Sequence, residues 1–200
     1  MALDTKKIFV PLADQTKTTG AALAGPVITE VPEHFEDVMT AIDGFGSTGY
    51  VSEDGIALST SLSTTDFKEM NRTTVRKGLD DFTGTVTYTE LQFLDETVLK
   101  RKFGDFAVDV VNANATHGKQ IHVSIGARLP PEQAYVWLLK DGDVRAIVLI
   151  PRGQVTNGVD VTFAANAMAT IATEVTAYDD GSGENTSIHI YFDDGEKVSA

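Results

Sequence analysis

The chain has 200 residues, no cysteine and a formal net charge of −13, from 16 Lys and Arg against 29 Asp and Glu. The lack of cysteine excludes disulfide frameworks, thiolate metal sites and a cysteine nucleophile. The acidic balance argues against a general duplex-DNA binder, whose affinity comes from cations that neutralise phosphates. With 42% hydrophobic and 22% charged residues, the chain is expected to fold as one domain, 1–200, with flexible ends at about 1–7 and 194–200.

The sequence contains no membrane or export signal. No apolar run approaches the roughly 18 residues of a spanning helix, and the first seven residues contain no apolar signal core. We therefore expect a protein made in the cytoplasm, with no membrane partner.

Most of the predicted elements are strands, because apolar and polar residues alternate with a period of two. Phe82, Val86 and Tyr88, for example, share one face of a segment whose other face carries threonines. A tight hairpin is expected where Asp141-Gly142-Asp143 joins two apolar runs. Strands are expected near Ile8, Tyr50 and Ile56, and over 82–89, 106–111, 120–125, 135–139, 144–150, 159–163, 167–178 and 188–192.

One segment, from about Glu90 to Phe103, is predicted to be a helix. Thr89 can cap its first turn while Gln92 reaches back, and its apolar residues form one stripe. Acids near its start and bases at 100–102 match the helix dipole. The dipole explains the basic last turn, so this turn does not indicate a nucleic-acid site.

Residues 59–74 are expected to form a long polar loop, because they are rich in Ser and Thr and mixed in charge. Loops of this length are usually functional or mobile. Charge is also segregated along the chain, since 18–67 contain no Lys or Arg whereas 68–77 contain four. A self-associating subunit can use such segregation to steer its neighbours, and ordinary solvated surface explains any single cluster as well.

Motifs of catalysis or ligand binding are weak. Gly44-Phe45-Gly46-Ser47-Thr48-Gly49 matches the dinucleotide pattern, but a strand is predicted to follow it where that motif needs a helix. None of the four histidines has metal-ligand spacing, and His122 and His189 are expected to face solvent from strands. We expect no enzyme, no cofactor and no metal site.

Several strings, in the same order along the chain, resemble the major tail tube proteins of bacteriophages with long, non-contractile tails. They are Gly49-Tyr50-Val51-Ser52-Glu53-Asp54-Gly55-Ile56 with the later Thr65-Asp66-Phe67-Lys68, then Phe82-Thr83-Gly84-Thr85-Val86-Thr87-Tyr88-Thr89, Leu91-Gln92-Phe93-Leu94, Ile150-Pro151-Arg152-Gly153-Gln154-Val155 and Glu174-Val175-Thr176-Ala177-Tyr178. The resemblance covers roughly residues 8–192, and the chain departs from the pattern at both ends and around 112–128.

The resemblance implies a mainly β, single-domain β-sandwich or barrel with one flanking helix at about 90–103. Members of this family assemble as hexameric rings that stack into a hollow tube, through which the genome is delivered. The implied location is the virion tail, with assembly in the host cytoplasm. The implied partners are further copies of the chain, a tape-measure protein and tail terminator and initiator proteins, and DNA passes through the lumen without specific binding.

The resemblance also points to site residues. The long loop that mediates ring stacking corresponds to about 59–77, and its predicted contact residues are Asp66, Lys68, Glu69, Arg72, Arg76 and Lys77. An acidic lumen would repel phosphates and let DNA slide. The acids predicted to line it are Glu30, Glu33, Glu36, Asp37, Asp43, Glu53 and Asp54.

Other functions stay open at this point. A non-catalytic β-sandwich module that binds carbohydrate or a cell surface shares the short strands and polar loops. Its usual aromatic platform finds little support, because Trp137, the one tryptophan, lies in an apolar run and is expected in the core. A hydrolase with a dispersed site and the inner tube of a contractile tail or secretion system are the remaining alternatives.

Overall fold

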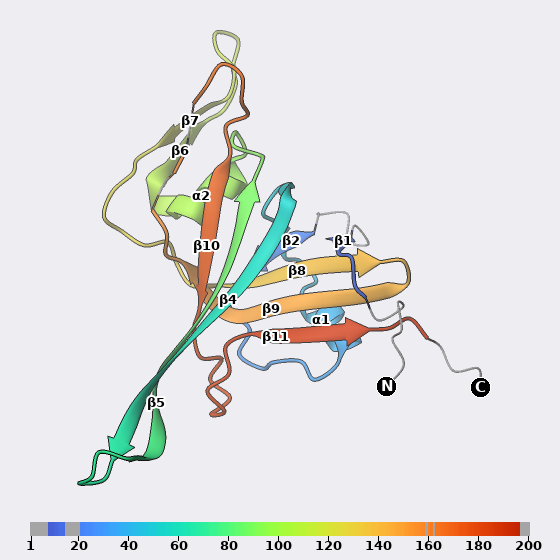
Figure 1. Cartoon of the computed structure of the whole chain (residues 1–200). Helices are drawn as coiled ribbons and strands as arrows, with labels where there is room; N and C mark the ends of the chain where they lie inside the picture. Colours follow the sequence, from blue (N-terminus) through green and yellow to red (C-terminus); the bar gives the residue numbers. More distant parts are fainter. Residues whose placement is uncertain (1–7, 15–20, 159, 162, 197–200) are drawn as a thin grey trace.

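A computed structural model describes residues 8–14, 21–158, 160–161 and 163–196 of the chain. The fold is mainly β, as predicted, with antiparallel sheets and flanking helices (Figure 1). Flexible ends were expected at about 1–7 and 194–200, and residues 1–7 and 197–200 lie outside the described residues.

The elements follow the predicted order for most of the chain. The strands are β1 (Leu12–Ala13), β2 (Ala22–Gly25), β3 (Gly46–Ser47), β4 (Val51–Lys68), β5 (Thr74–Glu90), β6 (Val108–Val111), β7 (Gln120–Val123), β8 (Gln133–Asp141), β9 (Val144–Val155), β10 (Ile171–Ala177) and β11 (His189–Asp193). The helices are α1 (Phe35–Ala41), α2 (Glu96–Phe103) and a 3-10 turn at Asp105–Ala107.

One large sheet organises the described residues. Its strand order is β3-β2-β8-β9-β10-β5-β4, with β1 added beside β8 and β11 added beside β9, and β6 and β7 form a separate pair. The pairs are antiparallel throughout. Two strands pair with the same edge of β9. β11 pairs with its first half and β10 with its last residues.

Alternate residues of β8 belong to two different cores, because successive side chains of a strand point to opposite faces. Tyr135 and Trp137 pack with Val86 and Val175 from β5 and β10, so the sheet folds back on itself as a sandwich. Val136 and Leu138, on the other face, pack with Val38 and Ile42 of the α1 region. Trp137 is 2% exposed, which confirms its predicted place in the core.

A third core lies under α2. Val98 and Leu99 of the helix pack with Val108 of β6 and Ile171 of β10. The β6–β7 pair and α2 therefore form a small layer beside the point where β5 ends and β10 begins (Figure 1).

The predicted helix is present but begins later than expected. Asp95 caps α2, its Oδ1 accepting from the backbone amides of Thr97 at 2.7 Å and Val98 at 3.4 Å. Thr89, the predicted cap, lies in β5 opposite Ala172 of β10. Strand pairing with β10 continues to Glu90, so tertiary hydrogen bonds override the local capping signal.

The first helix, α1, was not among the predicted elements. It has seven residues, and its N-cap residue His34 makes no side-chain capping bond. It is held by burial of Val38 against β8 and β9 rather than by a start signal that sequence reasoning can read. None of the helices in the described ranges is long and apolar enough to cross a membrane.

Two other local predictions differ from the structure. Residues 59–74, expected as a loop, are the outer part of a hairpin formed by β4 and β5. Asp160, Val161 and Phe163, expected in a strand, lie outside any strand, while 159 and 162 lie outside the described residues. The β8–β9 turn is as predicted, with Gly142 at φ +61°, a value that glycine adopts readily.

Candidate assembly surfaces

The β4–β5 hairpin projects far from the body of the molecule (Figure 1). The two strands stay paired from Ile56 and Tyr88 to Lys68 and Thr74 at the tip. β10 supports β5 only from Gly84 inward, so the outer part is a two-stranded ribbon. Such ribbons are of marginal stability in water, and this part therefore gains most from contact with another molecule.

Apolar residues continue along one face of the hairpin beyond the part that the core covers. Val86, opposite Leu58, is fully buried, whereas Leu62 and Phe82, the next apolar pair on that face, are 65% and 42% exposed. The other face carries Ser and Thr side chains, such as Ser61 opposite Thr83. Farther out, beyond Ser63 and Asp81, neither face of the ribbon is covered, and the sequence shows little of the alternation that marks a half-buried strand.

Four apolar side chains are exposed near the end of the hairpin, and we call them the apolar tip. They are Phe67 (54% exposed), Met70 (103%), Val75 (65%) and Leu79 (63%). Sequence reasoning missed them because it treated the segment as polar. The signal that was available is the presence of large apolar residues among serines, threonines and charges.

The turn at the end of the hairpin has a defined backbone. The Glu69 amide donates to the Thr73 carbonyl at 3.0 Å, and the Arg72 amide donates to the Glu69 carbonyl at 2.8 Å. Arg72 has φ +66°, the left-handed region, which costs a non-glycine residue about 1 kcal/mol. Two hydrogen bonds hold this conformation, so Met70 is presented at the apex by an ordered turn.

The six predicted contact residues all lie around this tip and are exposed. Asp66 and Lys77 face each other across the ribbon and form an ion pair of 3.3 Å. Lys68 ends β4, Glu69 and Arg72 belong to the turn, and Arg76 lies opposite Phe67. The tertiary structure thus brings together residues that sequence reasoning had assigned to one flexible loop.

The seven acids predicted to line a lumen are exposed but divided between two places. Five lie in or beside α1, which covers one face of β8 and β9. Glu53 and Asp54 lie instead in an irregular stretch of β4, between Val51 and Ile56, which pack against the core on the other face. The described structure does not bring the two groups together within one subunit.

One of these acids also has an intramolecular partner. Arg145 binds Glu36 at 3.1 Å and Asp193 at 2.9 Å, and its guanidinium lies 4.6 Å from the Phe35 ring centroid. Arg145 therefore ties α1 to β9 and β11.

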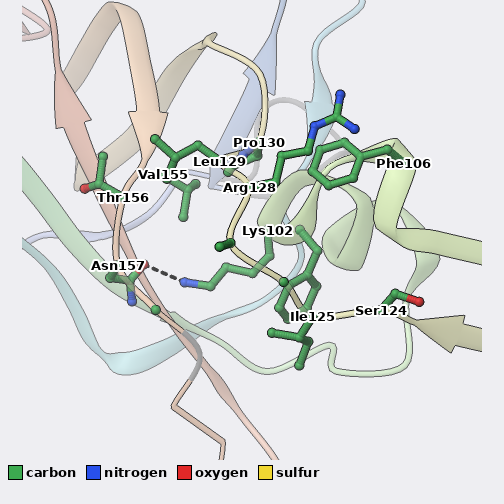
Figure 2. A pocket seen from close by; sticks show the side chains of 14 residues that line it. Lys102, Phe106, Ser124, Ile125, Arg128, Leu129, Pro130, Val155, Thr156 and Asn157 are labelled. Carbon is green, nitrogen blue, oxygen red and sulfur yellow. Dashed lines mark hydrogen bonds between the residues drawn. The ribbon is translucent and has the colours of Figure 1, made fainter.

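A pocket of about 260 Å³ lies between α2 and the end of β9 (Figure 2). Lys102 reaches across it and donates to Asn157 Oδ1 at 2.5 Å and to the Ala172 carbonyl at 2.9 Å. Burial lowers the pKa of Lys102 to about 8. Arg128 lies over the Phe106 ring at the rim, 3.8 Å from its centroid. The contacts of Lys102 fasten α2 to β10, which is a structural role.

A buried polar cluster lies at the root of the hairpin. Glu90 is 2% exposed, and its two carboxylate oxygens accept from the Tyr88 hydroxyl at 3.1 Å and the Thr173 hydroxyl at 3.2 Å. Burial raises the pKa of Glu90 to about 7, an effect that Lys102 and Arg101 oppose. The Arg101 guanidinium donates to the Ser47 carbonyl, which joins the helix to β3.

The histidines follow their predictions in part. His122 is largely exposed on β7, as expected. His189 was expected to face solvent, but its Nε2 lies 2.8 Å from the buried carboxylate of Asp180, so that prediction is wrong. Among the described residues, no three His, Cys, Asp or Glu side chains lie close enough to hold a metal ion.

Comparison with known proteins identifies the family. A search of the curated proteins found no match. The family described as phage tail tube protein matches residues 1–197, nearly the whole chain. It is a family of structural proteins that self-assemble into the tube of the virion tail, which agrees with the sandwich fold and the projecting hairpin. The chain therefore belongs to the phage tail tube protein family.

Proposed function

We propose that this chain is the major subunit of a long, non-contractile phage tail, and that it assembles as hexameric rings stacked into a hollow conduit for the genome. The observation that carries the proposal is the tail tube family match over residues 1–197. Under this proposal the whole chain acts as one tail-tube domain. The tape-measure protein and the terminator and initiator proteins are its expected partners, and assembly takes place in the host cytoplasm.

The β4–β5 hairpin is the proposed contact between rings. Its outer ribbon is supported by no third strand in the described residues, and its tip exposes four large apolar side chains. The six charged residues from Asp66 to Lys77 surround these side chains. Burial of apolar surface supplies affinity, while the charges align the partners and set specificity.

The same proposal gives the acids a role. Six copies of a chain with net charge −13 carry −78 per ring, so an acidic lumen would repel phosphates and let DNA slide without being held. The seven acids from Glu30 to Asp54 remain the proposed lining. Neighbouring subunits would have to bring the α1 group and the β4 group together.

Assembly is tested by negative-stain microscopy of the concentrated protein. Hollow tubes or six-fold rings are expected. A variant in which 64–80 are replaced by Asn-Gly, which closes the ribbon at Ser63 and Asp81, should keep its thermal unfolding but form no tubes. The exposed Lys140, beside the β8–β9 turn, offers the control variant Lys140→Ala, which should assemble. A wild-type chain that stays monomeric at every concentration and salt would overturn the proposal.

The lumen assignment can be tested separately by labelling single introduced cysteines, because the chain has no native cysteine that would react. Glu33→Cys and Glu53→Cys are each assembled and exposed to a small maleimide and to a maleimide on a polymer too large to enter the tube. Lining residues should react only with the small reagent, whereas dissociated subunits should react with both. Reaction of assembled tubes with the large reagent would remove that residue from the lumen.

A further inference from the structure

A second exposed apolar group lies at the opposite end of β5 from the apolar tip. It consists of Leu94 (83% exposed), Phe163 (75%) and Met168 (71%), and we call it the far-end cluster. Leu94 follows β5 by four residues and leads into α2. Phe163 is held in place by an edge-to-face contact with Phe93, with ring centroids 5.4 Å apart.

The two apolar groups are separated by the length of one strand. β5 has 17 residues, which at about 3.3 Å per residue place its ends roughly 50 Å apart. Figure 1 shows the hairpin tip and the α2 region at opposite ends of the molecule. No single copy can bring the two groups into contact, so neither group can be covered by the other within one subunit.

The far-end cluster borders an open depression that suits an apolar side chain. Its lining residues are Leu91, Gln92, Phe93, Leu94, Asp95, Phe163, Met168 and Ala169. Asp95, which also caps α2, is the one charged residue among them. The depression is therefore apolar with a negative rim.

We propose that the apolar tip of one copy docks into the far-end cluster of a second copy, with Met70 entering the depression beside Leu94 and Met168. The proposal rests on the tube assembly described above and names the surface that receives the hairpin. A contact between two different patches leaves the pair of subunits with one free tip and one free cluster, so it continues along an open stack.

Charge favours this pairing over contact between two tips and over docking into the pocket of Figure 2. Residues 66–77 carry four bases and two acids, a net +2, so the remaining chain carries −15. Two tips repel each other weakly, whereas a tip and the acidic rim at Asp95 attract. The pocket in Figure 2 is also partly apolar but is lined by Lys102 and Arg128, which disfavour a basic tip.

Cysteine cross-linking tests the contact against a background free of native thiols. Met70→Cys protein is mixed with Met168→Cys, Asn185→Cys or Phe192→Cys protein, and each mixture is assembled and first shown to form tubes by microscopy. The mixtures are then treated with a short bis-maleimide. Asn185 lies in an acidic depression that also borders Leu62 and Leu79 of the hairpin, and Phe192 lies in an exposed apolar area on β11, so they represent competing receptors.

The expected result is a covalent dimer in the Met168→Cys mixture and at most one-tenth of that yield in the others. Tubes that form without the Met70–Met168 product, or with Met70→Cys linked to itself, Asn185→Cys or Phe192→Cys, would overturn the docking proposal and leave tube formation intact. A wild-type chain that forms no tubes would overturn the proposed function, and the docking proposal with it.

A charge-pair rescue supplies a second readout. Met70→Glu and Met168→Lys should each raise the concentration needed for assembly at least about tenfold, equivalent to about 1.4 kcal/mol per contact. The double variant places the new charges opposite each other and should recover to within about threefold of wild type. Thermal unfolding checks that each variant is folded. A double variant no better than the singles contradicts the proposed contact.

Discussion

The hydroxyl of Tyr88 donates to a carboxylate oxygen of Glu90 across 3.1 Å inside the core, where both residues are at most 5% exposed. Glu90 also pairs through its backbone with Val51 of β4 and Ile171 of β10. The pair therefore lies at the end of β5 farthest from the tip, where β4, β5 and β10 meet, and its protonation state bears on the stability of that junction.

Stability is expected to fall as the pH rises from about 4.5 to about 7. Burial raises the pKa of Glu90 from 4.5 to about 7, so the folded state holds the proton more tightly than the unfolded state. The contribution of Glu90 to the free energy of unfolding is complete below pH 4.5 and is lost as the pH rises past 7. It amounts to about 3 kcal/mol. Urea unfolding across this pH range measures it.

Glu90→Gln should flatten this pH dependence, because the variant has no carboxyl to titrate at that position. Glu33→Gln, an exposed acid, serves as the control and should keep the wild-type slope. A wild-type free energy of unfolding that stays constant or rises between pH 4.5 and 7 would contradict the assignment to Glu90.

Asp95→Ala should destabilise the protein by about 1 kcal/mol, because it removes the side-chain acceptor for the Thr97 and Val98 amides. Asp95→Asn keeps an acceptor and should retain most of the stability. Thermal unfolding compares these variants with Thr89→Val, which removes the hydroxyl of the cap expected from sequence. If α2 began at Glu90 after all, the Thr89 hydroxyl would matter and Asp95→Ala would be nearly silent.

Two large apolar residues should respond differently to truncation. Ile147→Ala removes a fully buried side chain from the core beneath α1 and should cost about 2–5 kcal/mol of unfolding free energy. Leu79→Ala, at a side chain 63% exposed on the hairpin, should change the stability of the monomer by less than about 0.5 kcal/mol. Denaturant unfolding of both variants tests this, and equal losses would show that the hairpin packs within its own subunit.

Added salt should promote tube assembly. A proposed ring of −78 repels its neighbours over a Debye length of about 30 Å at 0.01 M salt and about 10 Å at 0.1 M. Light scattering should show assembly at a lower protein concentration in the higher salt, with uncharged sucrose as the control. The opposite trend would mean that attraction between opposite charges dominates the contact.

Much of the fold could be predicted from the sequence, because its signals are local. The β8–β9 hairpin follows from two apolar runs and the Asp141-Gly142-Asp143 turn, which specifies its own geometry. Most other strands follow from alternating residues that bury one face. The family resemblance and the tail tube match agree on what the chain is.

The conformation of the segment that carries the candidate site differs from the prediction. The six charged residues of 66–77 were expected in a loop, and pairing between β4 and β5 places them on an ordered ribbon. Both faces of that ribbon are exposed, so the alternation that marks a buried strand is missing there. The apolar tip was overlooked for the same reason.

The acidic charge, the absence of thiols and the strand-rich core could all be read from the sequence, since they depend on composition and on spacing along the chain. The start of α2, the burial of Glu90, the pairing of His189 with Asp180 and the division of the acids between α1 and β4 emerge from the three-dimensional arrangement alone. Each of these depends on residues distant in sequence, such as β10 pairing with β5 and Asp180 meeting His189. The net charge of −13 thus acquires a distribution: a basic, apolar hairpin tip projects from a body that carries the acids.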